Sequence, residues 1–261
     1  MLLLSKQPKV LEKKDNRGVF EVEALSPGYG TTVGNGLRRV LLSSLEGAAV
    51  TRVKIEDVKH EFSTIPGVYE DVIGILLNLK QMRFRVYSEE PQTGTLKVKG
   101  EKKVTGADFK FSSGMELVNP DVHIAELVDK KAELAMEVVV EKGTGYEFAE
   151  ARKKSKEEIG GIALDAAFSP VRRVSYRVEN MRVGERTDFD RLTVEVETDG
   201  SISPETAFHQ AADILVKQFT ILKDGVQPAE PAKASAPKKK AVPAKKKAAP
   251  KAKTKKKTAK A

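Results

Sequence analysis

Residues that commonly carry out chemistry are sparse in this chain of 261 residues. It has no cysteine, which excludes a thiolate nucleophile, a disulfide framework and a thiolate metal site. Its three histidines, His60, His123 and His209, lie far apart, and no two have the spacing of a zinc-binding HExxH pair. Carboxylates are plentiful, but none is expected to form a compact cluster for Mg²⁺. The sequence therefore predicts no catalytic residue, no metal site and no cofactor.

One glycine-rich stretch has two possible interpretations. The run Gly28-Tyr29-Gly30-Thr31-Thr32-Val33-Gly34 follows a predicted strand and opens a predicted helix, as a nucleotide-binding loop does. The third glycine comes one position too late for GxGxxG, and no GK[ST] follows. Glycines there serve equally well for a tight turn and close helix packing, which we favour. A nucleotide-binding enzyme is the alternative, and it predicts that the isolated chain binds ATP or a dinucleotide.

The positive charge is concentrated at one end. The whole chain has 46 Lys plus Arg and 37 Asp plus Glu, a net charge of +9. Residues 231–261 hold 13 of the lysines and no acidic residue, so the other 230 residues have a net charge of 33 − 37 = −4. Only the tail therefore has the charge expected of a nucleic-acid-binding segment.

The tail, residues 229–261, is predicted to be disordered. It consists mainly of Lys, Ala and Pro, has no aromatic residue and cannot bury enough surface to offset its ordering entropy. We expect non-specific binding of DNA through three lysine clusters: Lys238, Lys239 and Lys240; Lys245, Lys246 and Lys247; and Lys255, Lys256 and Lys257. Each neutralised phosphate would steepen the log–log salt dependence by roughly 0.9. The alternative is a tail that only keeps the protein soluble, and it predicts an unchanged slope after deletion of 231–261. A chromatin-like protein driven by its tail is a further alternative, in which the body is dispensable for DNA binding.

The body alternates between strand and helix patterns. Residues 18–25 alternate like a half-buried strand, a helix should begin near Thr31 or Thr32, and residues 50–55 read as a strand before a second helix over 68–80. Five strand-like segments follow, at 83–87, 95–98, 103–107, 121–125 and 133–140. Residues 142–161 are expected to form a mobile loop. Strands over 171–183 and 192–198 then precede a final helix from Ser203-Pro204. The prediction is an α+β fold, with no apolar run long enough to span a membrane.

The first predicted helix has a polar strip beside its apolar face. Val33, Leu37 and Leu41 recur at helical spacing on the apolar face. Arg38 and Arg39 lie on the opposite, narrow strip. Such a strip suits directional contacts to a partner. A solvated helix face is the usual explanation of an arginine pair, but it is weaker here because the helix around the pair has few other polar residues.

Two long blocks of the sequence resemble one family. The run PGYGTTVGNGLRRVLLSSLEGAAVTRVKIEDVKHEFSTIPGVYEDVIGILLNLK, residues 27–80, resembles the signature of bacterial-type RNA polymerase α subunits, and the resemblance continues through IGGIALDAAFSPVRRVSYRVENMRVGERTDFDRLTVEVETDGSISPETAFHQAADIL, residues 159–215. With the order of elements between them, it covers roughly residues 1–225. The family's usual second domain, a small helical DNA-binding unit, has no counterpart after Gln227, where the Lys/Ala/Pro tail stands instead.

The resemblance implies a two-subdomain amino-terminal fold. A helix-bearing dimerisation subdomain would comprise residues 1–46 and 173–228, with a β-rich insertion over 47–172. The implied homodimer contacts come from both terminal helices: Val33, Leu37, Leu41, Ile214, Leu215 and Phe219.

The resemblance also implies partners. In the family, the α dimer scaffolds assembly of the β and β′ subunits, with ω and σ in the complete enzyme, a nucleotidyltransferase to which α contributes no catalytic residue. The implied β contacts are Arg38, Arg39, Leu42 and Ser43. The implied β′ contacts are Lys80, Val171, Arg172, Arg173 and Tyr176. The expected location is the bacterial cytoplasm with the nucleoid, with a plastid as the alternative.

Overall fold

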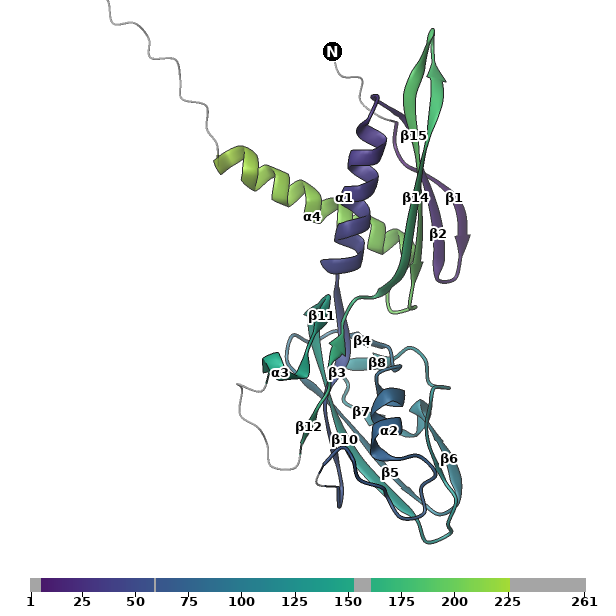
Figure 1. Cartoon of the computed structure of the whole chain (residues 1–261), viewed down its shortest axis with the longest axis vertical. Coiled ribbons are helices and arrows are strands. Elements are labelled where there is room, and N and C mark those ends of the chain that lie inside the picture. The colour runs from purple at the N-terminus through teal and green to yellow at the C-terminus, as the bar shows by residue number, and fades with distance from the viewer. Residues whose placement is uncertain (1–5, 59, 153–160, 226–261) are drawn as a thin grey trace, which may run out of the picture.

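Two large hydrophobic cores organise the chain in the computed structural model, which describes residues 6–58, 60–152 and 161–225. A small third cluster is formed by Ala49, Ala166 and Phe168. One core joins residues near both ends of the described chain, such as Phe20, Leu41 and Ala211. The other lies wholly between Val50 and Leu164. Figure 1 shows the two parts stacked end to end along the longest axis of the molecule. Strands outnumber helices, so the α+β prediction is confirmed.

The first part is an antiparallel sheet covered on one face by two helices. Its strands are β1 (Lys9–Lys14), β2 (Arg17–Leu25), β14 (Val171–Val183) and β15 (Arg186–Thr198), in the order β1-β2-β15-β14. The helices are α1 (Tyr29–Ser43) and α4 (Pro204–Gly225). Alternation along β15 buries Leu192, Val194 and Val196 on the face that the helices cover. The predicted strands over 18–25 and 171–183 are confirmed, and β15 begins six residues earlier than expected.

The predicted start of α1 at Thr31 or Thr32 is wrong. The helix begins at Tyr29, and no side chain of its own first turn caps it. Asp190 of β15 instead accepts a hydrogen bond from the Gly30 backbone N–H at 2.9 Å, and this carboxylate is buried. A carboxylate at a helix N-terminus satisfies an unpaired N–H and opposes the positive end of the helix dipole. The cap comes from a residue 160 positions away, so no local sequence pattern could reveal it.

The second part is β-rich and is inserted between α1 and β14. Its main sheet has the order β12-β3-β10-β5-β7, and three smaller sheets pair β11 with β13, β4 with β8 and β6 with β9. The strands are β3 (Glu46–Ile55), β4 (Phe84–Val86), β5 (Gln92–Lys99), β6 (Lys102–Thr105), β7 (Lys110–Phe111), β8 (Met115–Leu117), β9 (His123–Leu127), β10 (Glu133–Thr144), β11 (Tyr146–Glu147), β12 (Ile162–Ala163) and β13 (Ala166–Ala167). The helices are α2 (Val72–Leu79), the 3₁₀ turn η1 (Gly106–Asp108) and α3 (Ala149–Arg152).

Helix α2 is shorter than the predicted helix over 68–80. Asp71 is its N-cap and accepts a hydrogen bond from the Gly74 N–H at 2.7 Å. The preceding residues are extended because they pair with β9: the Tyr69 N–H donates to the Glu126 carbonyl, and the Val128 N–H donates to the Gly67 carbonyl, each at 2.9 Å. Backbone pairing to a distant strand therefore outcompetes the helical pattern of these residues.

The expected mobile loop over 142–161 is also wrong in part. Strand β10 continues to Thr144 because its end pairs with the start of β3, and β11 and α3 follow. Residues 153–160 lie outside the described residues, as does the tail over 229–261. Within the described residues, no helix combines the length and apolar character needed to cross a membrane.

The two parts meet where the chain crosses between them twice, through the start of β3 and the segment before β14 (Figure 1). At this junction a Cβ on Gly47 would lie only 1.7 Å from the Phe168 carbonyl oxygen. Val171 packs in the core of the first part, although the family resemblance placed it in the insertion over 47–172.

Substitution of Gly47 tests how tightly the junction is packed. We expect Gly47→Ala to lower the free energy of unfolding by about 3 kcal/mol or more, because the clash is with backbone. The matched control is Gly36→Ala in α1, whose Cβ would meet only Leu215 at 3.9 Å and should stabilise the helix by up to about 1 kcal/mol. Urea denaturation of both variants measures the difference. Equal stability of the two variants would contradict the junction geometry.

Candidate partner-binding surfaces

The three histidines are separate and each has a local partner. His60 shares a hydrogen bond with Ser63 at 3.1 Å, His123 contacts Glu70 at 2.6 Å, and His209 lies 3.3 Å from Asp213. Among the described residues, no group of three or more His, Cys, Asp or Glu side chains could hold a metal ion.

The glycine-rich stretch packs α1 against the sheet. A Cβ on Gly30 would lie 2.7 Å from Val178 Cγ1, and one on Gly34 would lie 2.7 Å from Tyr176 Cδ2. Both glycines therefore allow the helix to approach β14 more closely than any side chain would permit. This geometry supports packing as the role of the stretch.

Helix α1 uses its two faces differently. Leu37 and Leu41 are buried between the helix and the sheet. On the other side, Arg38, Arg39, Leu42 and Ser43 are all exposed, with Leu42 at 37%. Within the described part of the chain, neither arginine forms an ion pair, and the Ser43 hydroxyl donates to the Arg39 carbonyl at 2.7 Å. The strip is thus an ordered, unpaired basic surface, consistent with directional contacts to another molecule.

The predicted dimer residues fall into three groups. Leu37 and Leu41, at 4% and 0% exposure, already lie in the core of the protomer, so they have no surface left to offer a second copy. Val33, Ile214 and Leu215 are half-buried and pack against the same core. Phe219 is 65% exposed. The sheet of the same protomer covers Leu37 and Leu41 on the apolar face of α1.

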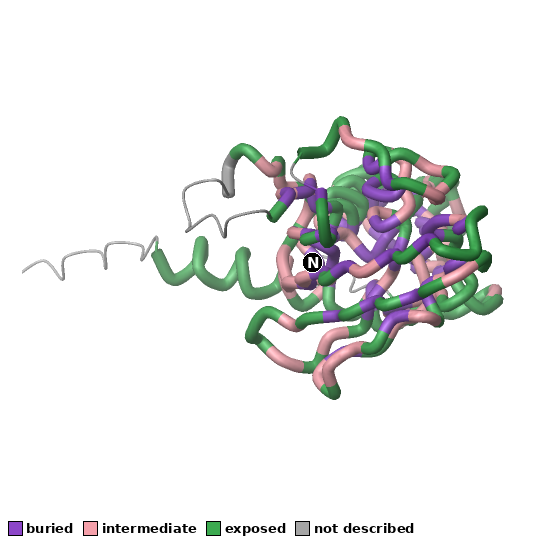
Figure 2. The backbone as a smooth tube through the Cα atoms, turned by 90° about the horizontal axis from the view of Figure 1, so that it is seen from below, coloured by how far each residue is buried: buried purple, intermediate pink, exposed green. Residues whose placement is uncertain are grey.

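The exposed apolar surface lies on the last turns of α4. Val216, Phe219, Ile221 and Leu222 are each between 63% and 65% exposed, and every described residue from 216 to 225 is exposed. Figure 2 shows this end of the helix projecting from the body. Contiguous apolar side chains of this kind mark an interaction surface. Val216, Ile221 and Leu222 were not among the predicted dimer residues, although the change from a one-sided stripe to apolar residues around the helix is visible in the sequence.

Lys80, at the end of α2, belongs to a small polar network. Its Nζ lies 3.2 Å from Asp165 Oδ2, and the Ala149 N–H donates to Asp165 Oδ1 at 2.9 Å. The Ala149 N–H lowers the pKa of Asp165, burial opposes this, and Lys80 and the Tyr146 hydroxyl lower it further. The network joins α2 to the segment that carries the exposed aromatic pair of Tyr146 and Phe148, whose ring centroids lie 5.1 Å apart.

The other predicted β′ contacts differ in exposure. Arg172 and Arg173 are exposed on β14. Val171 is buried, and Tyr176 is half-buried against Gly34. Among the predicted β′ contacts, only the two arginines are therefore fully exposed, and Lys80, like Tyr176, is half-buried. The lysine clusters of the tail lie outside the described residues.

A groove beside α2 adds residues that were not among the predicted sites. It has a volume of about 580 Å³ and is lined by Phe62, Leu77 and Lys80, among others. Phe62 is 75% exposed and Leu77 is 56% exposed. The sequence VIGILLNL makes α2 apolar on nearly every side. Because the core covers only one side of a surface helix, this pattern indicates that an apolar outer face stays exposed.

The described residues present exposed basic and apolar surfaces on α1 and α4, the kind of surface through which proteins bind other macromolecules. Residues 53–169 match the family described as the RNA polymerase Rpb3/RpoA insert domain, within the β-rich insertion. The chain is 50% identical to the DNA-directed RNA polymerase subunit alpha of Oceanobacillus iheyensis over 216 residues, which are 82% of this chain and 68% of that relative. It is 48% identical to the protein of the same name from Alkaliphilus oremlandii over 231 residues, 86% of this chain and 73% of the relative. The chain belongs to the family of DNA-directed RNA polymerase α subunits, and its role lies in transcription.

The Asp165 network predicts a pH-dependent contribution to stability. Because the pKa of Asp165 is below its ordinary value of 3.8, its contribution is present above that pH and is lost as the pH falls through the lower folded pKa. We expect Asp165→Asn to lower the free energy of unfolding at pH 7 by less than about 1 kcal/mol, since the ion pair is one-third exposed.

The measurement is urea denaturation from pH 7 to pH 3, where the difference from wild type should shrink. Asp121→Asn, at an exposed carboxylate with no ion pair in the described chain, is the control. A deficit that stays constant down to pH 3 would contradict the assignment.

Proposed function

We propose that this chain is the scaffold subunit of a DNA-directed RNA polymerase: it forms a homodimer, which then captures the β and β′ subunits. The relatives are named as subunits of that enzyme, a nucleotidyltransferase, and we assign no catalytic residue to this chain. The exposed apolar end of α4, which nothing else in the described chain covers, carries the proposal.

The dimer contact is proposed to centre on the last turns of α4. Phe219 supplies an exposed aromatic ring, and Val216, Ile221 and Leu222 surround it on the same helix. The half-buried Ile214 and Leu215 extend this surface toward the body of the protomer. A twofold axis would place the same surface of each copy against the other, which gives both exposed helix ends an apolar environment.

The large subunits are proposed to bind at polar surfaces. Arg38 and Arg39, with Leu42 and Ser43, form the proposed β surface on α1. Lys80, Arg172 and Arg173 form the proposed β′ surface. Exposed guanidinium groups suit such contacts because they bind carboxylates and backbone carbonyls with fixed geometry.

We also propose a cytoplasmic location beside the nucleoid, with ω and σ joining the assembled enzyme. The lysine-rich tail, residues 229–261, is proposed to add non-specific affinity for DNA. Its composition of 13 Lys and no acidic residue within 231–261 supports this role. A shallower salt dependence of DNA binding after deletion of 231–261 is the expected result, and an unchanged slope would contradict it.

Substitution of Arg39 tests the proposed β surface. We expect Arg39→Ala to weaken capture of co-expressed β by roughly 30-fold, as for an interface arginine worth about 2 kcal/mol. Its unfolding midpoint should not change, because Arg39 is exposed and unpaired in the described chain. The control is Arg182→Ala, an exposed arginine near the tip of the β14–β15 hairpin. Full capture of β by Arg39→Ala would refute the site, while family membership would stand.

A further inference from the structure

The turn between β15 and α4 lies against the insertion. Asp199 Oδ1 accepts hydrogen bonds from the Ser201 N–H at 2.9 Å and from the Ser201 hydroxyl at 2.6 Å, which fixes the shape of the turn. Helix α4 begins three residues later, at Pro204. A contact that fixes the position of this turn therefore also fixes the first turn of α4.

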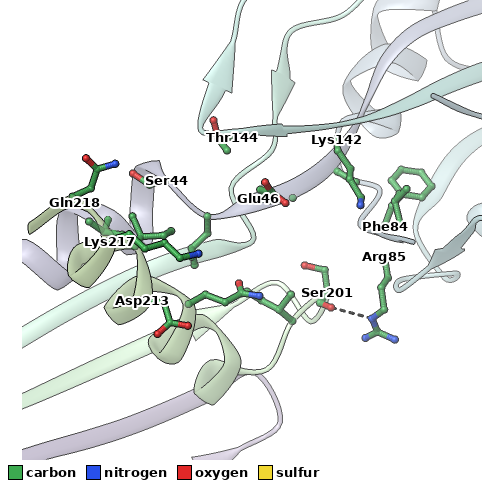
Figure 3. A pocket seen from close by; sticks show the side chains of 18 residues that line it. Ser44, Glu46, Phe84, Arg85, Lys142, Thr144, Ser201, Asp213, Lys217 and Gln218 are labelled. Carbon is green, nitrogen blue, oxygen red and sulfur yellow. Dashed lines mark hydrogen bonds between the residues drawn. The ribbon is translucent and has the colours of Figure 1, made fainter. Parts of the chain in front are cut away.

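Two arginines of the insertion bind the turn. Arg83 Nε lies 3.4 Å from Asp199 Oδ2, and the two side chains are only 24% and 6% exposed. Arg85 Nε donates to the Ser201 carbonyl at 3.0 Å (Figure 3). A second Arg85 nitrogen donates to the Gly200 carbonyl at 3.3 Å. We call Arg83, Arg85 and the turn Asp199–Ser201 the clasp.

Arg83 also reaches the end of α2. One of its terminal nitrogens donates to the Lys80 carbonyl at 2.7 Å and to the Met82 carbonyl at 2.9 Å. A single guanidinium thus joins the segment that carries Lys80 to the turn that starts α4. Burial lowers the pKa of Arg83, the Asp199 carboxylate opposes this, and Arg172 lowers it further. Asp199 therefore stabilises the charged form of a guanidinium that is partly removed from water.

Beside the clasp, open space separates the body of α4 from the insertion. A cleft of about 710 Å³ lies between α4 and the insertion, and its lining includes Lys142, Glu46, Arg85 and Lys217 (Figure 3). Its lining also includes apolar side chains such as Phe84 and Ile214. Among the described residues, the side-chain hydrogen bonds and the ion pair between the turn and the insertion are those of Arg83 and Arg85. Two chain crossings beside an open cleft would leave the angle between the parts free to vary without a further contact.

We propose that Arg83 and Arg85 are positioning residues that fix the orientation of the insertion relative to α4. The proposal rests on the proposed function in one respect: the fixed orientation matters because α4 carries the dimer contact and the insertion carries Lys80. With the clasp closed, formation of the dimer sets where each Lys80 surface lies. With the clasp open, the insertion takes many orientations, and only one of them binds β′. The apparent affinity for β′ then falls in proportion to the fraction of molecules in that orientation.

Asp199→Asn is the test variant, because it removes the charge that faces Arg83 while its amide oxygen can still accept the Ser201 hydrogen bonds. Arg85→Ala is a second variant that leaves Asp199 intact. The control is Arg186→Ala, which removes an exposed Arg–Asp pair within the first part alone. The chain has no cysteine, so cysteines at exposed Thr95 and Arg177 attach one spin label to each part.

Pulsed electron paramagnetic resonance on labelled chain, diluted with excess unlabelled chain, reads the distance within one protomer. We expect a single narrow distribution for wild type and Arg186→Ala, and a broad one for Asp199→Asn and Arg85→Ala. If the competent orientation falls to about a tenth of the population, capture of β′ by the dimer should weaken about tenfold. Dimerisation should be unchanged.

Narrow distributions in both test variants, or a broad one in wild type, would overturn the clasp. Broadening without weaker capture of β′ would overturn its positioning role. If wild type captures no β′ at all, the proposed function is contradicted instead, and the distance measurement still decides whether the clasp fixes the orientation.

Discussion

The end of α4 extends beyond the surface that its own protomer can cover. The helix has 22 residues, a length of about 33 Å at 1.5 Å per residue, and its buried positions stop at Ala211. Beyond that point it continues with Val216, Phe219, Ile221 and Leu222, all more than 60% exposed. Covering these side chains stabilises the protein only if another apolar surface is available. The first part of the chain is arranged so that this end remains free.

Helix α1 explains why the protomer cannot cover α4 itself. The two glycines that contact β14 place α1 directly on the sheet, so its apolar residues are used inside the protomer. Its strip with Arg38 and Arg39 remains outside, together with the exposed Leu42. One short helix therefore supports the core and leaves a directional surface exposed. The insertion, with its own core, leaves a separate outer face along α2.

Local patterns in the sequence predicted much of the fold. Alternation predicted β2 and β14, and the Ser203-Pro204 start predicted α4, because each pattern reflects burial that the segment meets over its whole length. The errors arose where distant residues decide local structure. Asp190 caps α1 from another strand, and β9 pairs with the residues before α2.

The candidate site was harder to predict than the fold. Leu37 and Leu41 look the same in the sequence whether a sheet or a second protomer covers them, and only the close approach of α1 to β14 distinguishes the two cases. The arginines of the clasp were not predicted at all. Arg83 and Asp199 are 116 positions apart and have no shared pattern, so their contact follows from the packing of the two parts.

In the proposed dimer a second copy of this chain covers the apolar end of α4, and the mass of the particle in solution tests this most directly. Sedimentation equilibrium of the purified chain should give twice the chain mass of 28.6 kDa. Phe219→Asp should give a folded particle of a single chain mass, whereas Phe62→Asp, at a phenylalanine of the insertion that is even more exposed, should remain a dimer. A wild-type protein with a single chain mass, or a Phe219→Asp variant that remains a dimer, would contradict the account.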